Sequence, residues 1–386
     1  MVYHAFGAAT NPDESQARQA GMSEQTTPQG TEGTRDTPKP AVTLRDLGWK
    51  PHFQQQIFED DTLAGLRPAR VTAVHRSGLQ VIGPGVDTAL PPFIDPEGGD
   101  AANATIGDWL LLDPDLPTAR HMLERFSLFK RRVPGTGRAV QLIAANVDTV
   151  FIVTSCNQDF NVARLERYLT LARQAEVTPV LVLTKPDLAE DPEGYVEQAQ
   201  ALDRSIVVEL VNAKTLEGAE RLLPWCGPGQ TVVFVGSSGV GKSTLVKTLT
   251  GQQQIATQGI REDDAKGRHT TSSRELYQLS SGAWLVDTPG MRELSLADVK
   301  DGLDRVFADL TELSTQCRFK DCAHEAEPGC AVKHAVARGD VDAPRVERWK
   351  KLVSEDAFNA LSLVEKRARD KAFGKMVKTT IKGKKR

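Results

Sequence analysis

The stretch from Gly236 to Ser243 has the pattern Gly-x4-Gly-Lys-Ser. An apolar run precedes it and a good helix start follows it. Backbone N–H groups and the positive end of the helix dipole therefore converge on one place that suits a phosphate. Lys242 is expected to neutralise the β- and γ-phosphates of a nucleoside triphosphate, and the Ser243 hydroxyl to hold Mg²⁺. The predicted phosphate-binding residues are Gly236, Ser237, Ser238, Gly239, Val240, Gly241, Lys242, Ser243 and Thr244.

A second motif, Thr184-Lys185-Pro186-Asp187, follows another apolar run. The carboxylate of Asp187 can accept hydrogen bonds from N1–H and the 2-amino group of guanine, a donor pair that adenine lacks. Lys185 would lay its stem against the base. Thr184 stands where asparagine is usual, and it keeps a hydroxyl but loses the amide. Guanine preference is therefore expected to depend mainly on Asp187.

A third stretch, Asn212-Ala213-Lys214, comes after the next apolar run. It lies where GTPases place a loop whose backbone contacts O6 of guanine. Alone it is a weak signal, but its spacing from Asp187 favours GTP over ATP as the nucleotide.

An apolar strand ends at Asp287, followed by Thr288-Pro289-Gly290. Asp287 is expected to hold Mg²⁺ through water, and the backbone N–H of Gly290 to approach the γ-phosphate. The next residue is Met291, where Ras-like enzymes use a glutamine to orient the attacking water. A thioether cannot orient water in that way, so another group must do so or hydrolysis is slow.

The segment 267–273 is polar and rich in turn-forming residues. One of its threonines, Thr270 or Thr271, is expected to ligate Mg²⁺ when a γ-phosphate is present. His269 could orient or deprotonate the water in place of the missing glutamine, although a histidine in a surface loop is often inert.

Three cysteines and a histidine make the spacing Cys-x4-Cys-x-His-x5-Cys, at Cys317, Cys322, His324 and Cys330. Three thiolates and one imidazole complete a tetrahedral Zn²⁺ site and leave no position open for water, so we expect one structural zinc ion. His334 is a spare candidate that more plausibly lies on a helix surface. The other two cysteines, Cys156 and Cys226, lie in apolar surroundings and are expected to be structural thiols in a reducing compartment.

The 386 residues carry a net charge of −3, which hides a polar N-terminus and a strongly basic C-terminus. No run approaches the roughly 18 apolar residues that a membrane helix needs, and the first residues do not resemble a secretion signal. A cytoplasmic protein with no membrane partner is expected, and nothing in the sequence demands more than a monomer.

Short runs rich in β-formers lie between about Leu66 and Arg132, separated by glycine and proline, and predict a small antiparallel barrel. An OB-fold is favoured, although the spacing alone does not separate it from an SH3-like barrel. Continuous apolar runs alternating with amphipathic stretches predict a doubly wound parallel sheet from about Val140 to Leu294. The expected segments are a disordered tail (1–40), a linker (41–65), the OB-fold domain (66–132), the P-loop GTPase domain (133–295), a helical zinc-binding domain (296–365) and a basic tail (366–386).

The order of these motifs is rotated, because the base-reading stretch precedes the phosphate loop. This order, Gly-Arg-His-Thr-Thr at 267–271, Asp-Thr-Pro-Gly-Met-Arg-Glu at 287–293, and the cluster with its Glu-Pro-Gly-Cys ending closely resemble the RsgA/YjeQ family of circularly permuted GTPases. The resemblance covers about residues 66–365. It implies the three-domain α/β organisation given above and a role in late maturation of the small ribosomal subunit, which stimulates the hydrolysis of GTP to GDP. It also implies Thr271 as the magnesium ligand and His269 as the residue aiding hydrolysis.

A barrel, a zinc domain and a lysine-rich tail together suit binding to rRNA, since clustered cations attract backbone phosphates. Two other functions are open at this stage. One is an RNA-binding scaffold in which the nucleotide only stabilises a conformation. The other is an ATP-hydrolysing metal-trafficking protein, which the closed ligand set and Asp187 oppose. From the motif order we also hypothesise that the nucleotide state passes from residues 287–290 into the zinc domain.

Overall fold

The computed structural model describes residues 42–96, 99–132, 140–203, 205–250, 274–287 and 299–360, and the structural statements below concern these residues. Both expected tails lie outside the described residues, as do His269, Thr271 and Gly290. Within the described part, no helix has the length and apolar character needed to cross a membrane.

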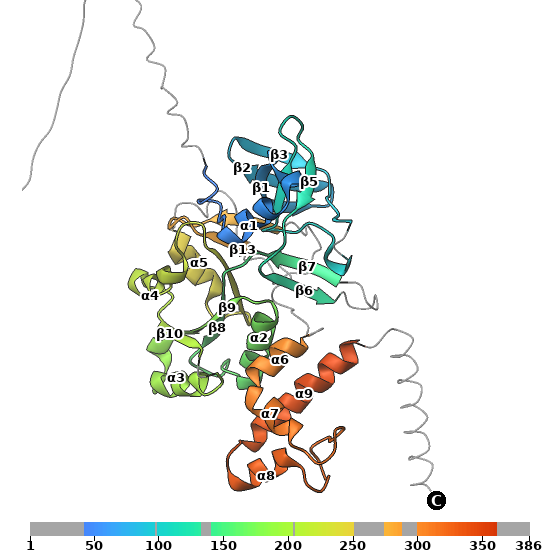
Figure 1. Ribbon diagram of the computed structural model, residues 1–386. Helices are drawn as coiled ribbons and strands as arrows, with labels where there is room; N and C mark the ends of the chain where they lie inside the picture. Colours follow the sequence, from blue (N-terminus) through green and yellow to red (C-terminus); the bar gives the residue numbers. More distant parts are fainter. Residues whose placement is uncertain are drawn as a thin grey trace, which may run out of the picture. The chain divides into compact units, whose positions relative to one another are not determined.

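The N-terminal domain is a curved antiparallel sheet of five strands (Figure 1). The strand order is β3-β2-β1-β4-β5, with β1 hydrogen-bonded to both β2 and β4. Alternate side chains such as Val71, Val81 and Leu110 are buried together in one core. Five short strands around a shared core fit the partly open barrel of an OB-fold. The strands are β1 (Arg67–His75), β2 (Gly78–Gly83), β3 (Val86–Leu90), β4 (Trp109–Leu112) and β5 (Ala119–Met122).

The central domain is a doubly wound sheet in which β10, β9, β8, β11 and β13 are parallel neighbours in that order. Successive residues of β8 enter opposite cores: Val150 and Ile152 pack on the side of α2, whereas Phe151 and Val153 pack on the side of α5. Burial on both faces explains why these strands are continuous apolar runs. The strands are β8 (Thr149–Ser155), β9 (Thr178–Thr184), β10 (Val207–Val211), β11 (Thr231–Gly236), β12 (Arg274–Gln278) and β13 (Trp284–Asp287).

Helices cover both faces of this sheet (Figure 1). The helix α2 begins after Asn161, whose side-chain oxygen accepts a hydrogen bond from Arg164 N at 2.9 Å and so satisfies one free N–H of the first turn. The helices of this domain are α2 (Val162–Gln174), α3 (Pro192–Gln200), α4 (Leu216–Glu220) and α5 (Lys242–Thr250).

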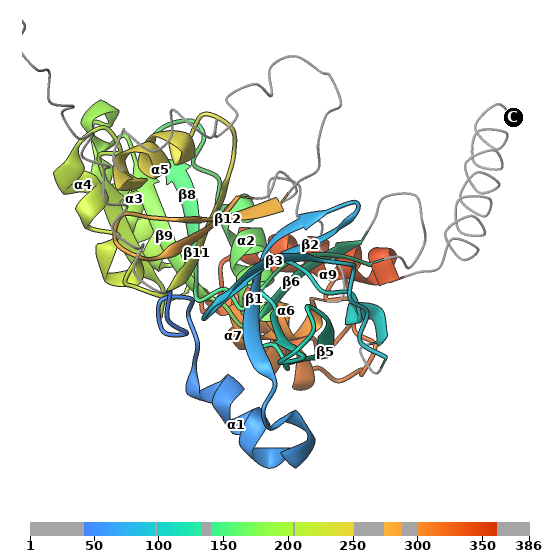
Figure 2. The same ribbon diagram turned by 90° about the horizontal axis from the view of Figure 1, so that it is seen from above.

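The barrel and the central sheet are hydrogen-bonded to each other through β12 (Figure 2). β12 is antiparallel to β13 on one side and to β1 on the other, where Ala73 pairs with Glu275 and Val74 with Arg274. The result is one continuous sheet through both domains. A separate hairpin of β6 (Leu128–Arg132) and β7 (Val140–Ala145) lies along the chain between them, with Lys130 exposed.

The segment 41–65, expected to be a linker, contains the helix α1 (Pro51–Glu59) and two fully buried side chains, Leu47 and Phe53. The buried guanidinium of Arg70 donates to Leu47 O and to Thr231 Oγ1, both at 2.6 Å. Trp284 Nε1 also donates to Asp46 O at 2.8 Å. These bonds connect the segment to β1, β11 and β13, so it holds the barrel and the central sheet together.

The C-terminal helices pack on α2 through a close backbone contact and a set of ion pairs. A side chain at Gly302 would lie 2.2 Å from Thr170 O, so only glycine allows this approach. The helices are α6 (Lys300–Val306), α7 (Ala308–Thr315), α8 (Ala331–Arg338) and α9 (Ala343–Ala360).

Glu166 of α2 is the centre of these ion pairs. Its carboxylate is fully buried and accepts from Arg348 Nε at 2.6 Å, with Arg345 at 3.5 Å. A neighbouring pair, Arg167 with Glu355, is about equally exposed on both sides at 29% and 28%. This buried carboxylate and its arginines fix α9 on α2. If α9 moved away, the charge of Glu166 would stay buried without a counter-charge.

We expect Glu166→Gln to destabilise the protein by about 3 kcal/mol, since it leaves two arginines without their buried counter-charge. Urea unfolding followed by circular dichroism measures this change. The matched control is Glu355→Gln, which breaks a half-exposed pair and should cost about 1 kcal/mol or less. Equal effects of the two substitutions would contradict the assignment of Glu166 as the anchor.

Candidate functional site: a nucleotide site and a metal site

The loop between β11 and α5 follows the backbone path that a phosphate-binding loop needs. Gly236 has φ +141°, and a side chain there would lie 2.1 Å from Val153 O on the neighbouring strand. Gly239 and Gly241 have φ +79° and +103°. Residues with side chains rarely adopt these conformations, so the three glycines are required by the backbone itself. Nothing lies within 4 Å of the position that a side chain on Gly239 would take.

The side chain of Lys242 bends back over this loop. Its ammonium donates to Gly236 O at 2.8 Å and to Ser237 O. Ser243 is half-buried at the first turn of α5, whereas Ser238 and Thr244 are exposed. The ammonium of Lys242 thus lies beside the N-terminus of α5, and both are positively charged features that favour an anion such as a phosphate.

The base-reading motif meets the phosphate loop at the end of β9. Thr184 is fully buried, and its hydroxyl lies 2.5 Å from Val240 O. Lys185 has φ +58°, and its ammonium donates to Gly239 O at 2.8 Å. The chain then makes one 3-10 turn, Pro186–Leu188, which leaves Asp187 exposed. Two motifs more than fifty residues apart are therefore joined by side-chain contacts.

The stretch after β10 completes this group. Asn212 Oδ1 accepts from Lys214 N at 3.1 Å, and Ala213 O accepts from the hydroxyl of Thr248 on α5 at 3.0 Å. A side chain on Gly241 would lie 3.6 Å from Thr184 Oγ1 and 3.7 Å from Ala213 Cβ. The three predicted stretches thus surround one position at the carboxyl ends of the parallel strands, where α/β sheets bind ligands.

Asp287 is the last residue of β13. β13 runs parallel to β11, with Val286 beside Val233, so it ends on the same edge of the sheet as the phosphate loop. The predicted residues His269, Thr271 and Gly290 lie outside the described residues.

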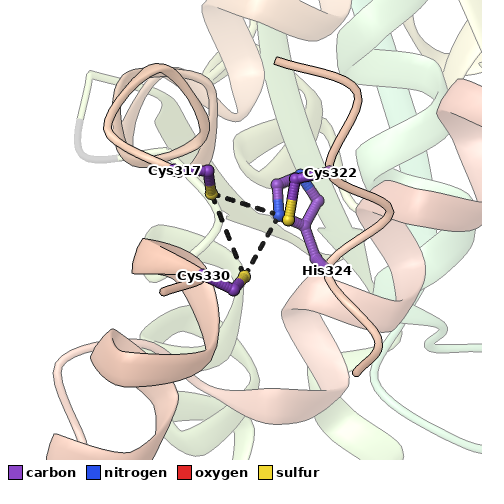
Figure 3. A group of neighbouring side chains, drawn as sticks. All are labelled: Cys317, Cys322, His324 and Cys330. Atoms are coloured by element: carbon purple, nitrogen blue, oxygen red, sulfur yellow. Dashed lines mark hydrogen bonds between the residues drawn. The ribbon is translucent and has the colours of Figure 1, made fainter. Parts of the chain in front are cut away.

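The second site brings together Cys317, Cys322, His324 and Cys330 from the segment between α7 and α8 (Figure 3). The four ligand atoms all lie within 4.8 Å of one another, and Sγ of Cys317 and Cys330 are 3.9 Å apart. Sulfurs bound to one tetrahedral zinc would be about 3.8 Å apart, given a Zn–S bond near 2.3 Å. The Nδ1 atom of His324 lies 3.4 Å from Cys330 Sγ and 3.6 Å from Cys317 Sγ. These four side chains could hold a metal ion.

Comparison with known proteins identifies the chain's relatives. The model of the RsgA GTPase family matches residues 122–297. The small ribosomal subunit biogenesis GTPase RsgA 2 of Vibrio parahaemolyticus is 47% identical over 349 residues, which are 89% of this chain and 94% of that protein. The RsgA protein of Mesorhizobium japonicum is 50% identical over 323 residues, 82% of this chain and 91% of that one. The chain belongs to the RsgA family of GTPases.

Solved structures show the same architecture. YjeQ from Thermotoga maritima aligns with a TM-score of 0.55 at 26% identity, over 75% of this chain and 98% of that one. YloQ, a circularly permuted GTPase, aligns with a TM-score of 0.53 at 23% identity, over 77% of this chain and 96% of that one. The predicted fold class is confirmed: an OB-fold barrel, a permuted GTPase sheet and a helical C-terminal domain with a possible metal site.

In this member of the RsgA family, two residues besides the four candidate ligands support the metal site. Trp349 of α9 packs against the ring of His324, with centroids 5.3 Å apart. The Glu327 carboxylate accepts from Ala323 N and Glu325 N, both at 2.8 Å. Hydrogen bonds from its own amide and from Ala323 and Glu325 lower the pKa of Glu327 to about 2. The sequence shows Glu327 only as part of the Glu-Pro-Gly-Cys ending and does not reveal its backbone partners, and Trp349 lies on a helix that is distant along the chain from His324.

The two remaining cysteines of this RsgA protein are buried in the two cores of the central sheet, Cys156 on one face and Cys226 on the other. Burial raises the pKa of Cys156 to about 11 and that of Cys226 to about 12. Both thiols therefore stay protonated at neutral pH and act as small apolar side chains, as expected.

If the cluster binds a metal ion, removing that ion with a chelator should change the fluorescence of Trp349, because Trp349 packs against the ring of the candidate ligand His324. The measurement is tryptophan emission during chelation, with metal release followed by a colorimetric dye. A Trp349→Phe variant should release metal with a much smaller emission change. Metal release with no spectral change in the native protein would contradict this coupling.

Glu327→Gln should weaken metal retention about tenfold, because it replaces one of the two carboxylate oxygens that accept from the amides of the loop carrying His324 with an NH2 group, which cannot accept. Competition with a chromogenic zinc chelator measures the affinity. Glu325→Gln serves as the control, since that carboxylate faces Lys350 Nζ at 3.4 Å. A larger loss in the control than in Glu327→Gln would show that general loop charge, rather than the backbone acceptor, sets the affinity.

Proposed function

We propose that this protein hydrolyses GTP to GDP and phosphate and acts in late maturation of the small ribosomal subunit, which stimulates the hydrolysis. One observation carries the nucleotide part: Thr184 and Lys185 contact consecutive carbonyls of the phosphate loop, so the base reader and the phosphate binder form one site. The subunit part is supported by the relatives, which are named small ribosomal subunit biogenesis GTPases.

The phosphate loop provides the main contacts to the nucleotide. Its backbone N–H groups would hold the phosphates, and Lys242 would turn from the loop carbonyls to the β- and γ-phosphates. When bound, Mg²⁺ would neutralise charge that develops between these phosphates. We assign Ser243, Thr271 and Asp287 to hold it, and Gly290 to approach the γ-phosphate.

We assign base recognition to residues 184–187 and 212–214. The exposed carboxylate of Asp187 is available to N1–H and the 2-amino group of guanine, and Lys185 to the base face. Residues 212–214 would meet O6 through the backbone. This division favours GTP over ATP, because adenine offers no donor pair to Asp187.

We assign the catalytic roles to Lys242 and His269. Met291 replaces the glutamine that orients water in Ras-like enzymes. His269 is proposed to take that part by orienting or deprotonating the water. Slow turnover is expected until the ribosomal subunit positions this segment.

The metal is proposed to be one structural Zn²⁺ ion held by Cys317, Cys322, His324 and Cys330. Three thiolates and an imidazole are zinc's preferred ligands, and the closed set leaves no site for catalysis or for passing the ion on. This argues against a metal-trafficking protein. Zinc would supply folding free energy to a domain with a small core.

The small subunit and its rRNA are the proposed partners. The proposed domains are the barrel (66–132), the GTPase domain (133–295) and the zinc domain (296–365), followed by the basic tail at 366–386. Lys130 on the β6–β7 hairpin adds an exposed cation near the junction of the first two. Cations of this kind attract rRNA phosphates. A monomer working in the cytoplasm is part of the proposal.

The test is GTP hydrolysis by the purified protein alone, with small subunits and with large subunits. Slow turnover alone and an increase of at least about tenfold with small subunits are expected, by analogy with GTPases whose partners complete the site. Lys242→Ala should abolish both rates. Equal rates in the three conditions would contradict the proposal, and subunit maturation supported by Lys242→Ala in cells would favour an RNA-binding scaffold instead.

A further inference from the structure

The side chain of Thr184 is enclosed by backbone carbonyls. It is the last residue of β9 and has no exposed surface. Its hydroxyl oxygen lies 2.5 Å from Val240 O in the phosphate loop and 3.1 Å from Thr154 O on β8. Both neighbours are acceptors, so in each contact the hydroxyl must be the donor.

A threonine hydroxyl has one hydrogen to donate. It can therefore make a full hydrogen bond to only one of the two carbonyls, and Val240 O is the closer one. With either acceptor, the hydrogen is used within the protein and none remains for a ligand. An asparagine amide has two hydrogens and could bond to Val240 O while pointing the second at a ligand. The replacement of asparagine by threonine therefore changes what this position can do, although it keeps the contact to the loop.

The neighbouring residues show that this contact fixes the loop. Lys185 binds Gly239 O, the carbonyl that precedes Val240 O. The next residue, Gly241, has φ +103°, and a side chain there would reach to 3.6 Å from Thr184 Oγ1. Val240 itself is buried, in the same core as Leu245 of α5. The carbonyl of Val240, between two glycines, is thus held by the hydroxyl of Thr184, together with the Lys185 contact and the buried Val240 side chain.

We propose that Thr184 is a positioning residue that holds the phosphate loop through Val240 O and gives no hydrogen bond to the imidazole edge (N7) of the bound purine. This inference rests on the proposed guanine-nucleotide site and specifies how it selects its base. Selection of guanine then depends on hydrogen bonds from Asp187 to the pyrimidine edge of the base. The contact between Thr184 and Val240 O raises the affinity for the diphosphate, and this effect is the same whether position 7 of the base is nitrogen or carbon.

The experiment compares GDP with 7-deaza-GDP, in which carbon replaces N7, by isothermal titration calorimetry with Mg²⁺. The proteins are the wild type, Thr184→Val, which keeps the shape, and Thr184→Ser, which keeps the hydroxyl. Thr184→Val should bind both nucleotides about tenfold more weakly, because Val240 O loses its donor. Thr184→Ser should stay within about threefold of the wild type for both. The ratio of the two dissociation constants should be the same in all three proteins.

Two outcomes would overturn the inference. One is a wild-type preference for GDP over 7-deaza-GDP that disappears in Thr184→Val, since this would show the hydroxyl bonding to N7. The other is unchanged GDP binding in Thr184→Val. Calorimetry separates these from misfolding, because an unfolded fraction lowers the number of sites and leaves the ratio of constants unaffected. Wild-type protein that binds neither nucleotide would contradict the proposed function itself.

Discussion

The nucleotide site depends on the close approach of Gly236 to the carbonyl of Val153. The two residues are paired between β11 and β8, and no side chain fits between them. This contact lets β11 turn sharply into the phosphate loop two residues before the level at which β9 ends. Thr184 then reaches Val240 O, and α5 begins with Lys242 facing the loop. A larger residue at position 236 would separate the strands and move every one of these groups.

The rotated motif order has a mechanical meaning in this structure. β12 lies between the segment that contains Thr271 and β13, and it hydrogen-bonds to β1 of the barrel. The segment proposed to bind magnesium therefore directly precedes, along the chain, a strand that is paired with the barrel. The C-terminal helices are fixed at a different place, on α2 through Glu166 and Gly302. Besides the hypothesised passage of the nucleotide state through residues 287–290 into the zinc domain, the pairing of β12 with β1 offers a candidate route to the barrel.

Much of this architecture follows from the sequence because its signals are local. Buried parallel strands are continuous apolar runs, the phosphate loop needs glycines at fixed positions, and Cys317 to Cys330 have metal-ligand spacing within fourteen residues. What the sequence does not reveal is long-range. The pairing of β1 with β12, the bond from Trp284 to Asp46 and the ion pairs of Glu166 join residues that are far apart along the chain. The ordered helix α1 in the expected linker exists for the same reason, since its buried Phe53 packs against Trp109 of the barrel.

The choice between an OB-fold and an SH3-like barrel also needed the structure, because it depends on which strands pair. Local composition gives strand positions and not partners. Likewise, the sequence shows that Thr184 keeps a hydroxyl but loses the amide of asparagine, and only the structure shows that this hydroxyl contacts Val240 O of the phosphate loop.

We infer that residues 184–187 and the phosphate loop form one guanine-nucleotide site. A crystal structure of the protein with GDP and Mg²⁺ tests this most directly. We expect the diphosphate to be surrounded by the backbone N–H groups of residues 237–243, with Asp187 bound to N1–H and the 2-amino group of guanine. A diphosphate in that loop whose base lies away from Asp187 and residues 212–214 would contradict it.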